Sequence, residues 1–348
     1  MSGLLELRNV TKVFGGGIFS KNRTTALEDL SFTLDTDQSS ITSIVGESGS
    51  GKTTVARLLL GMIAPTKGHI FYKGNDVAEM SRVERKEFRR EVQPIFQDPF
   101  EVFNPFYKVD HVLKVPISKF KLASSEGEER SMISDALEMV GLRPDETLGR
   151  YPHQLSGGQR QRIMVARSLL LKPRVILADE PVSMVDASLR ATILESIHKL
   201  NRELGISILY ITHDLTTAYQ ISDNILVLYR GSVAEGGSVE AVIKDPKHPY
   251  TQLLVGSIPQ PNPDLTWSEG RTSVVPVANR AVTGCKFADR CDSVMNLCWN
   301  NIPPRYQLDR YRVAACHLFR DSPVMTGSDV SQVFAARTEM SRQTPSVK

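Results

Sequence analysis

The chain has 348 residues, of which 41% are hydrophobic and 23% charged, and its formal net charge is +3. This composition predicts a soluble protein with one large core and a smaller second domain, and the near-neutral balance gives no reason to expect a nucleic-acid partner. No apolar run reaches the roughly 18 residues of a membrane-spanning helix. The first ten residues, MSGLLELRNV, lack the basic start and apolar core of a secretory signal, so we expect action in the cytoplasm.

The first 45 residues are predicted to form antiparallel strands beside a nucleotide site. Apolar and polar residues alternate in LLELRNV, which begins at Leu4, and in ALEDLSFTL, which begins at Ala26. A third, more apolar run, SSITSIV, ends at Val45 and is also β-prone.

The segment GESGSGKT follows that run and opens an apolar-periodic stretch, KTTVARLLLGMI. Strand, glycine-rich turn and helix form the context in which the pattern G-x-x-x-x-G-K-[ST] binds nucleotide phosphates. Inward-pointing backbone N–H groups and the helix dipole would cradle the anion, Lys52 would neutralise the β- and γ-phosphates, and Thr53 would offer its hydroxyl to Mg²⁺. The residues predicted to hold the nucleotide are Gly46, Glu47, Ser48, Gly49, Ser50, Gly51, Lys52, Thr53 and Thr54.

A strand, VQPIF, is predicted to lead to Gln97, after the mixed-charge run RVERKEFRR, which is typical of a solvated helix face. From about residue 98 to 156 the chain loses β character, and EERSMISDALEMVGL predicts an amphipathic helix closed by Gly141. The segment DPFEVFNPFYKV beyond Gln97 would offer a groove to a partner helix if its aromatics are exposed; a locally packed turn is the alternative. Its aromatics are Phe100, Phe103, Phe106 and Tyr107.

The segment LSGGQ precedes a long predicted helix, QRQRIMVARSLLL. Ser156, Gly157 and Gly158 would therefore form a second anion site at a helix N-terminus. Because one nucleotide needs only one such site, we predict that two chains hold two nucleotides between them, each contacted by a loop from either partner. The residues predicted for this contact are Leu155, Ser156, Gly157, Gly158 and Gln159.

The run PRVILADE predicts a buried parallel strand that ends in two adjacent carboxylates. Successive strand residues point to opposite sides, so Asp179 and Glu180 are predicted to act differently. Asp179 suits the outer sphere of Mg²⁺, and Glu180 suits the positioning and deprotonation of the attacking water. After the next strand, ISILYIT, His213 is predicted to contact the γ-phosphate and support Glu180, with a structural histidine as the alternative. Between these strands, a long helix is predicted with Asp186 as N-cap and Gly205 at its end.

The four cysteines all lie beyond a proline-rich stretch that predicts a boundary near residue 258. A disulfide is disfavoured in a reducing cytoplasm, whereas four thiolates can bind Zn²⁺ or an iron–sulfur cluster. The spacings lack the C-x₂-C pairs of zinc ribbons, which favours the cluster, and unliganded cysteines are the alternative. The predicted ligands are Cys285, Cys291, Cys298 and Cys316.

With these motifs the chain resembles the ATP-binding subunits of ABC transporters over roughly residues 4–240. The resemblance implies that Phe14 stacks on adenine and that Gln97 links Mg²⁺ to the membrane subunits, whose coupling helices dock on the aromatic segment. An ordinary core residue is the alternative for Phe14, and Phe19 is a nearby competitor. The family usually has S-A-L-D in the segment that faces the partner site; here it reads Ser183, Met184, Val185 and Asp186, which keeps the polar ends.

The segments HPYTQLL, GCKFADRC and VAACHL resemble the C-terminal extension of oligopeptide and dipeptide importer ATPases, which is associated with a [4Fe-4S] cluster. Lys286 and Asp292 stand where the family often has proline. The resemblance implies a second ATP-binding subunit, identical or paralogous, two transmembrane permeases and an extracytoplasmic solute-binding protein. The chain would then lie on the cytoplasmic side of the inner membrane.

We therefore predict an α/β P-loop NTPase of the ABC ATPase type, with an antiparallel β-subdomain, an inserted helical subdomain at about 98–160 and a small cysteine-rich extension. The nucleotide-binding domain is predicted over 1–257, the extension over 258–325 and a disordered tail over 326–348. The predicted function is ATP hydrolysis with Mg²⁺, coupled to solute import, foremost of peptides.

Nickel, opines and oligosaccharides are alternative solutes. Two other functions are alternatives to solute import: a soluble ATPase that remodels a ribosome or DNA, and a metal-sensing module with a relic ATPase. The first would be favoured by two cassettes or a long coiled-coil insertion, and the chain has neither. Intact Lys52, Glu180 and LSGGQ argue against the second.

Overall fold

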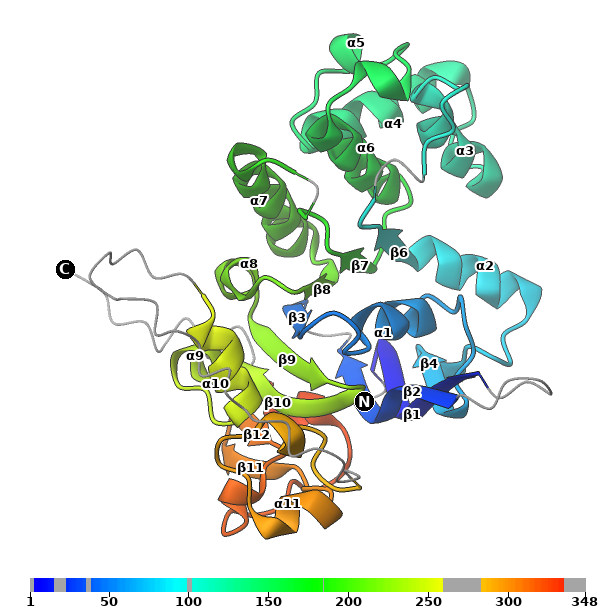
Figure 1. The fold of residues 1–348 in the computed structure, drawn as a ribbon. Helices are drawn as coiled ribbons and strands as arrows, with labels where there is room; N and C mark the ends of the chain where they lie inside the picture. The colour runs from blue at the N-terminus through cyan, green and yellow to red at the C-terminus, as the bar shows by residue number, and fades with distance from the viewer. Residues whose placement is uncertain are drawn as a thin grey trace, which may run out of the picture. The chain divides into compact units, whose positions relative to one another are not determined.

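The computed structural model describes residues 3–15, 23–35, 39–98, 102–183, 185–258 and 283–334. The chain forms two compact units, whose helices and strands are drawn in Figure 1. The first unit comprises residues 1–36, 42–78 and 212–348, and the second comprises 37–41 and 79–211. The cysteine-containing extension therefore belongs to the same unit as the segment GESGSGKT.

The first unit contains an antiparallel sheet with the strand order β2-β1-β4-β5. Leu5 of β1 pairs with Leu34 of β2 on one side and with Tyr72 of β4 on the other. These pairings confirm the antiparallel strands predicted from LLELRNV and ALEDLSFTL, whereas the run that ends at Val45 pairs in parallel with residues 224–227. The strands are β1 (Leu5–Gly15), β2 (Arg23–Leu34), β4 (Lys67–Tyr72) and β5 (Asn75–Asp76).

A second set of strands in this unit runs in the order β11-β12-β10-β9-β3. β3 and β9 are parallel, and all their residues are buried, as expected for a strand covered on both faces. β9 and β10 form a hairpin whose turn residues, Arg230 and Gly231, both have positive φ. β12 pairs with β10, so the extension adds strands to this sheet. The strands are β3 (Ile41–Val45), β9 (Asn224–Tyr229), β10 (Ser232–Ser238), β11 (Tyr306–Asp309) and β12 (Arg312–Ala314).

The helices of the first unit are short. They are α1 (Lys52–Leu59), α8 (Leu215–Ile221), α9 (Val239–Lys244), α10 (Pro249–Gly256) and α11 (Asn296–Asn300), with 3₁₀ turns at Ala288–Arg290, His317–Phe319 and Val330–Val333. One hydrophobic core of this unit combines residues from the predicted nucleotide-binding domain with Phe287 of the extension. Its buried residues include Val45, Ile225, Val227 and Tyr250.

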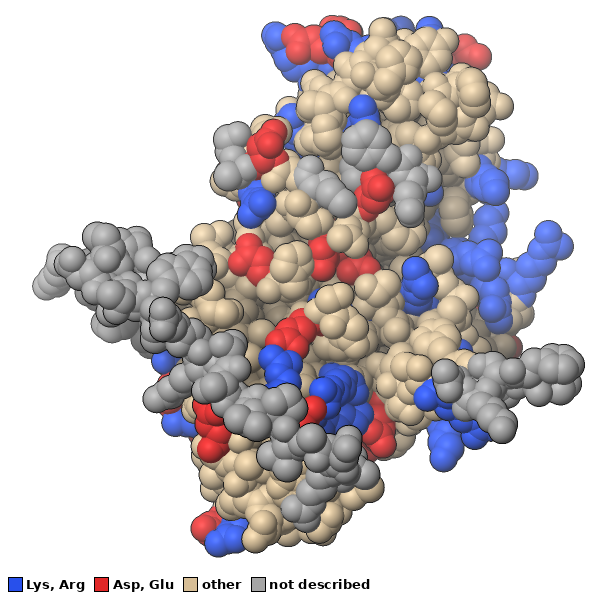
Figure 2. All heavy atoms as spheres, in the orientation of Figure 1, with Lys and Arg blue, Asp and Glu red and all other residues tan. Residues whose placement is uncertain are grey.

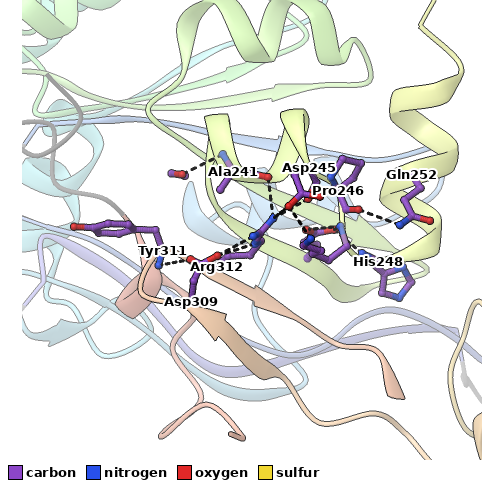
Figure 3. Close-up of polar contacts among 11 residues, drawn as sticks. Ala241, Asp245, Pro246, His248, Gln252, Asp309, Tyr311 and Arg312 are labelled. Atoms are coloured by element: carbon purple, nitrogen blue, oxygen red, sulfur yellow. Dashed lines mark hydrogen bonds and ion pairs between the residues drawn. The ribbon is translucent and has the colours of Figure 1, made fainter. Parts of the chain in front are cut away.

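The extension is also fixed by Arg312, which Figure 3 shows reaching the C-terminal end of α9. Its Nη1 donates hydrogen bonds to the carbonyl oxygens of Ala241 at 3.1 Å and Asp245 at 2.7 Å, and its Nε donates to the Asp309 carboxylate at 3.0 Å. A cation at the last carbonyls of a helix is favourable because those groups have no partner within the helix.

The predicted disordered tail, residues 326–348, starts too early. Val330 and Val333 are buried, the hydroxyl of Thr33 donates to the Asp329 carboxylate at 2.5 Å, and the ring of Phe334 meets that of Phe32 edge to face. Residues 326–334 therefore have a structured place against β2, while residues 335–348 lie outside the described part. The predicted boundary near 258 falls where residues 259–282 also lie outside it.

The second unit contains three parallel strands in the order β8-β7-β6, as predicted for a sheet that carries its functional groups at the strand ends. The strands are β6 (Val92–Ile95), β7 (Val175–Asp179) and β8 (Ser207–Thr212). The helices are α2 (Arg82–Glu91), α3 (Asp110–Phe120), α4 (Glu126–Met139), α5 (Pro144–Thr147), α6 (Gly157–Leu169) and α7 (Ala187–Leu204), with a 3₁₀ turn at Pro152–Gln154.

Three helix predictions for this unit are confirmed. α4 is followed by Gly141 with φ of 69°, and α7 starts after Asp186 and ends at Gly205 with φ of 66°. α2 is a charged, mostly exposed helix with Phe88 as its buried residue and a Ser81–Glu84 capping box at its start. Figure 2 shows the Lys and Arg side chains gathered over α2. No helix of the described residues is both long and apolar enough to cross a bilayer.

Candidate functional site

The loop from Gly46 to Gly51 has a backbone that glycine alone fits at two points. Gly46 has φ of 151°, and a Cβ added there would lie 2.2 Å from the carbonyl oxygen of Leu228. Gly51 has φ of 107°, and its added Cβ would lie 2.5 Å from the carbonyl oxygen of Ala26. The loop is therefore pressed against β2 and β9, and any side chain at these positions would displace it.

The helix that follows the loop presents an N-terminus suited to an anion. α1 begins at Lys52, and its N-cap, Gly51, has no side chain to occupy the terminal N–H groups. The Lys52 side chain is 7% exposed, and its Nζ donates to the carbonyl oxygens of Gly46 at 2.6 Å and Glu47 at 2.9 Å. The buried hydroxyl of Ser50 has no hydrogen-bond partner among the described residues. An open helix terminus, a buried cation and a hydroxyl with unused capacity fit a phosphate group, and Thr53 is exposed beside them.

Two residues missed by sequence reasoning hold this loop from outside. The hydroxyl of Tyr250 accepts a hydrogen bond from the backbone N–H of Glu47 at 2.8 Å. The guanidinium of Arg290 contacts both carboxylate oxygens of Glu47, at 2.7 and 2.8 Å. The hydrogen bond from Arg290 lowers the pKa of Glu47, and burial raises the pKa of Tyr250 to about 12. Tyr250 could have been suspected from the HPY segment, but nothing local marks Arg290.

In the second unit, the ends of β6 and β7 bring two predicted residues together. The amide Nε2 of Gln97 donates a hydrogen bond to the Glu180 carboxylate at 2.9 Å. Gln97 follows β6, Glu180 follows β7, and these two strands pair in parallel. The prediction that Asp179 and Glu180 point to opposite sides because both lie on a strand is wrong. The strand ends at Asp179, and Glu180 has a left-handed backbone with φ of 45°.

The left-handed backbone at Glu180 is fixed by neighbours on both sides. Its N–H donates to the carbonyl oxygen of Ile211 at 2.8 Å, and its own carbonyl oxygen accepts from the Ser183 hydroxyl at 3.0 Å. A left-handed non-glycine residue costs about 1 kcal/mol, and such residues gather at functional sites.

The segment LSGGQ starts α6 with a capping box. Ser156 Oγ accepts from the N–H of Gln159 at 3.2 Å, and the Gln159 side chain accepts from the N–H of Ser156 at 2.9 Å. Gly157 and Gly158 lie inside the first turn, and a Cβ on Gly158 would lie 2.8 Å from Leu189 Cδ1. A side chain at this position would therefore have to displace the Leu189 side chain of α7, independently of any anion. The predicted contact to a second nucleotide stays a prediction.

The remaining predicted residues take separate positions. His213 follows β8 and is exposed, and so is Asp186. Phe14 is 42% exposed, and Lys12 Nζ lies 5.1 Å from the centre of its ring. This exposure rules out a core role for Phe14. Phe19, Phe100 and Met184 lie outside the described residues.

The aromatic segment beyond Gln97 is divided between packing and exposure. Phe103 is 8% exposed, whereas Phe106 is 86% and Tyr107 52% exposed. Tyr107 stacks on His111 with ring centres 4.5 Å apart. One of these described aromatics is therefore packed locally and two are exposed, and the docking of a partner helix on them stays a prediction.

The four cysteines are free thiols in the described part of the chain. Burial raises the pKa of Cys291 to about 11 and that of Cys316 to about 12, with smaller contributions from the other thiols. Within the described ranges, no group of three His, Cys, Asp or Glu side chains is arranged to hold a metal ion. The predicted iron–sulfur or zinc site is therefore not supported by the side-chain arrangement.

Comparison with known proteins gives two family matches, "ABC transporter" over residues 27–183 and "Oligopeptide/dipeptide transporter, C-terminal region" over residues 234–298. The chain is 36% identical over 322 residues to the putative oligopeptide transport ATP-binding protein YkfD of Bacillus subtilis (strain 168), covering 92% of this chain and 96% of that protein. The chain belongs to the ABC transporter ATP-binding protein family. The dipeptide transport ATP-binding protein DppF of Haemophilus influenzae is 38% identical over 303 residues, which cover 86% of this family member and 91% of DppF.

Solved structures agree with this assignment. The dimeric structure of the ATP-binding cassette MJ0796 in a post-hydrolysis state, bound to ADP and Pi, matches with a TM-score of 0.60 at 30% identity. The match covers 68% of this chain and 98% of that one. The predicted ABC ATPase fold is confirmed, and the protein is an ATPase of this family.

Proposed function

We propose that this ABC ATPase drives the import of peptides through separate membrane subunits. The observation that carries the proposal is the likeness to oligopeptide and dipeptide transport ATP-binding proteins over nine-tenths of the chain, the C-terminal region included. A putative peptide import ATP-binding protein of Brucella ovis, 38% identical over 291 residues, adds support. Nickel, opines and oligosaccharides remain the alternative solutes, because an ATP-binding subunit does not itself bind the solute.

The roles of the site residues follow from their chemistry. Lys52 and the loop from Gly46 to Thr54 would bind the phosphates, and Phe14 would stack on the base. Thr53, Gln97 and Asp179 would hold Mg²⁺, which neutralises phosphate charge when bound. Glu180 would be the general base for the attacking water. In support, its carboxylate accepts a hydrogen bond from the Gln97 amide, so the carboxylate is held by an adjacent strand end. His213 would contact the γ-phosphate.

The assembly would place two ATP-binding subunits around two nucleotides. Leu155 to Gln159 and the segment ending at Asp186 would complete the partner's site. Two permeases would dock on the exposed Phe106 and Tyr107, and an extracytoplasmic solute-binding protein would act through them. This arrangement would put the chain on the cytoplasmic face of the cell membrane.

The test is ATP turnover by the chain alone and after reconstitution with its permeases and companion ATPase, with Glu180→Gln as the inactive control. We expect turnover that depends on assembly and rises with a peptide-loaded binding protein. If a binding protein loaded with another solute stimulates turnover instead, that solute and not peptides is the cargo. Turnover indifferent to the permeases would instead favour a soluble remodelling ATPase.

We also propose that Cys285, Cys291, Cys298 and Cys316 bind an iron–sulfur cluster, with Zn²⁺ as the alternative. In support, the other three thiols each add to the raised pKa of Cys316, after the larger effect of burial. Their side chains would have to rotate toward a common centre, since no three are so arranged in the described residues. Iron, sulfide and zinc analysis of the anaerobically purified chain tests this, with Cys316→Ser as control; a metal-free chain would refute it.

A further inference from the structure

An ion pair joins the C-terminal extension to the phosphate-binding loop. Arg290 Nη1 and Nη2 each donate to a different oxygen of the Glu47 carboxylate, at 2.7 and 2.8 Å. Both side chains are a little over one-third exposed, at 36% and 39%. Two parallel bonds to one carboxylate fix its orientation as well as its charge, which a single contact does not.

Arg290 is itself held where it can make this contact. Its guanidinium carbon lies 5.7 Å from the ring centre of Tyr229 and 5.5 Å from that of Phe287, and its Nη1 donates to the Tyr229 hydroxyl at 3.4 Å. Stacking on two aromatic rings restricts the rotamers of a long side chain and stabilises the cation. The guanidinium is therefore placed before any nucleotide arrives.

The same loop residue is also held through its backbone. The fully buried Tyr250 accepts the N–H of Glu47, and its ring packs on those of Tyr229 and Phe287 at 4.5 and 5.5 Å. Tyr229 ends β9, and Phe287 belongs to the extension. One aromatic cluster thus supports both of the groups that hold Glu47.

Because Glu47 is negatively charged, its ion pair with Arg290 affects how well the loop can bind phosphates. A carboxylate in a loop that receives phosphates repels them, and this repulsion is reduced when a guanidinium neutralises it. Lys52 contacts the carbonyl oxygen of Glu47, so a displaced Glu47 would also disturb the residue that is to bind the phosphates.

We propose that Arg290 is a positioning residue of the nucleotide site: by holding Glu47, the cysteine-containing extension keeps the phosphate loop ready for ATP. The inference rests on the proposed role of residues 46–54. It predicts that Arg290→Ala weakens binding without removing any group that touches the nucleotide. A partly exposed, bidentate pair leads us to expect a dissociation constant raised about 3- to 10-fold.

The experiment measures MgATP affinity of the full chain with a fluorescent ATP analogue, and KM and kcat for ATP in the assembled transporter. We expect Arg290→Ala to raise the dissociation constant and KM with little change in kcat, and Arg290→Lys to restore part of the affinity. Lys286→Ala is the matched control, because Lys286 joins the same extension to Glu28 at 2.7 Å. This control should bind ATP like the parent chain.

A double-variant cycle separates action through Glu47 from a general loosening. Glu47→Gln combined with Arg290→Ala should be no worse than Arg290→Ala alone, because the shared interaction is already lost. Parent-like affinity in Arg290→Ala, or effects that simply multiply in the double variant, would overturn the proposal. Lys52→Met distinguishes the two failures: if it too binds ATP like the parent, the assignment of the phosphate loop itself is wrong.

Discussion

Gln97 donates a hydrogen bond from its side-chain amide to the carboxylate of Glu180, across 83 positions of the chain. The contact is produced by topology, since β6 and β7 are parallel neighbours and each residue follows the end of its strand. Adjacent carboxyl ends of parallel strands are where α/β proteins assemble their sites. A change at either residue is therefore expected to be felt by the other.

Glu180→Gln should reduce ATP turnover by orders of magnitude and spare ATP binding. The amide oxygen can still accept from Gln97, so the local contact survives, but the group proposed to take the proton from water is no longer basic. General base catalysis contributes about 10²–10⁴-fold, so turnover should fall by at least that range. Single-turnover hydrolysis and equilibrium binding on the same preparation check this, and near-parental hydrolysis would remove Glu180 from its role.

Lys52→Met should lose nucleotide affinity. The methionine keeps the apolar stem of the side chain but removes a charge-assisted donor worth about 1.5–3 kcal/mol, or roughly 10- to 150-fold in dissociation constant. Titration with ATP and with ADP checks this. Because Lys52 also donates hydrogen bonds to the carbonyl oxygens of Gly46 and Glu47, the melting temperature without nucleotide should decrease slightly as well.

Gly46→Ala and Gly49→Ala should differ in stability although both glycines have positive φ. The new Cβ at position 46 would lie 2.2 Å from the Leu228 carbonyl oxygen, whereas nothing lies within 4 Å at position 49. We expect Gly49→Ala to cost about 1 kcal/mol from backbone strain alone and Gly46→Ala clearly more. Denaturant unfolding in the absence of nucleotide measures both, and equal losses would show that the collision is relieved by a small shift.

Two buried groups should give opposite pH dependences. Burial raises the pKa of Glu235 from 4.5 to about 7 and lowers that of His248 from 6.5 to about 4. Between pH 4.5 and 7 the folded chain holds a proton on Glu235 that the unfolded chain has released, so this group makes stability fall as pH rises. Between pH 4 and 6.5 the unfolded chain holds a proton on His248 that the folded chain lacks, so this group makes stability rise.

Replacing either Glu235 or His248 should reveal how the other group makes the free energy of unfolding depend on pH. Glu235→Gln should give a free energy of unfolding that rises from pH 4.5 to 6.5, and His248→Asn, which keeps a capping acceptor for the Tyr250 N–H, should give one that falls. Each slope is at most about 1.4 kcal/mol per pH unit. Denaturant titrations at both pH values measure it, and parallel profiles in the two variants would contradict the assignment. Arg312, which faces Glu235, stays in both.

The sequence predicts those features that depend on neighbours along the chain. The strand before Gly46, the helix after it and the end of α7 at Gly205 follow from local periodicity and capping chemistry. The left-handed backbone of Glu180 does not, because it is imposed by Ile211 from another strand. Arg290 likewise looks like an ordinary surface arginine until the fold brings it to Glu47.

The distance along the chain between Glu47 and Arg290, 243 positions, has a consequence for biosynthesis. A ribosome adds about 5–20 residues per second, so roughly 12 to 50 seconds separate the two partners as the chain emerges. Tyr250 also arrives late, 203 positions after Glu47. During that interval the nascent loop carries the Glu47 carboxylate without the Arg290 guanidinium that neutralises it. A chain that stalls before residue 290 never forms this ion pair. The affinity of the loop for ATP would then increase only after translation has passed residue 290.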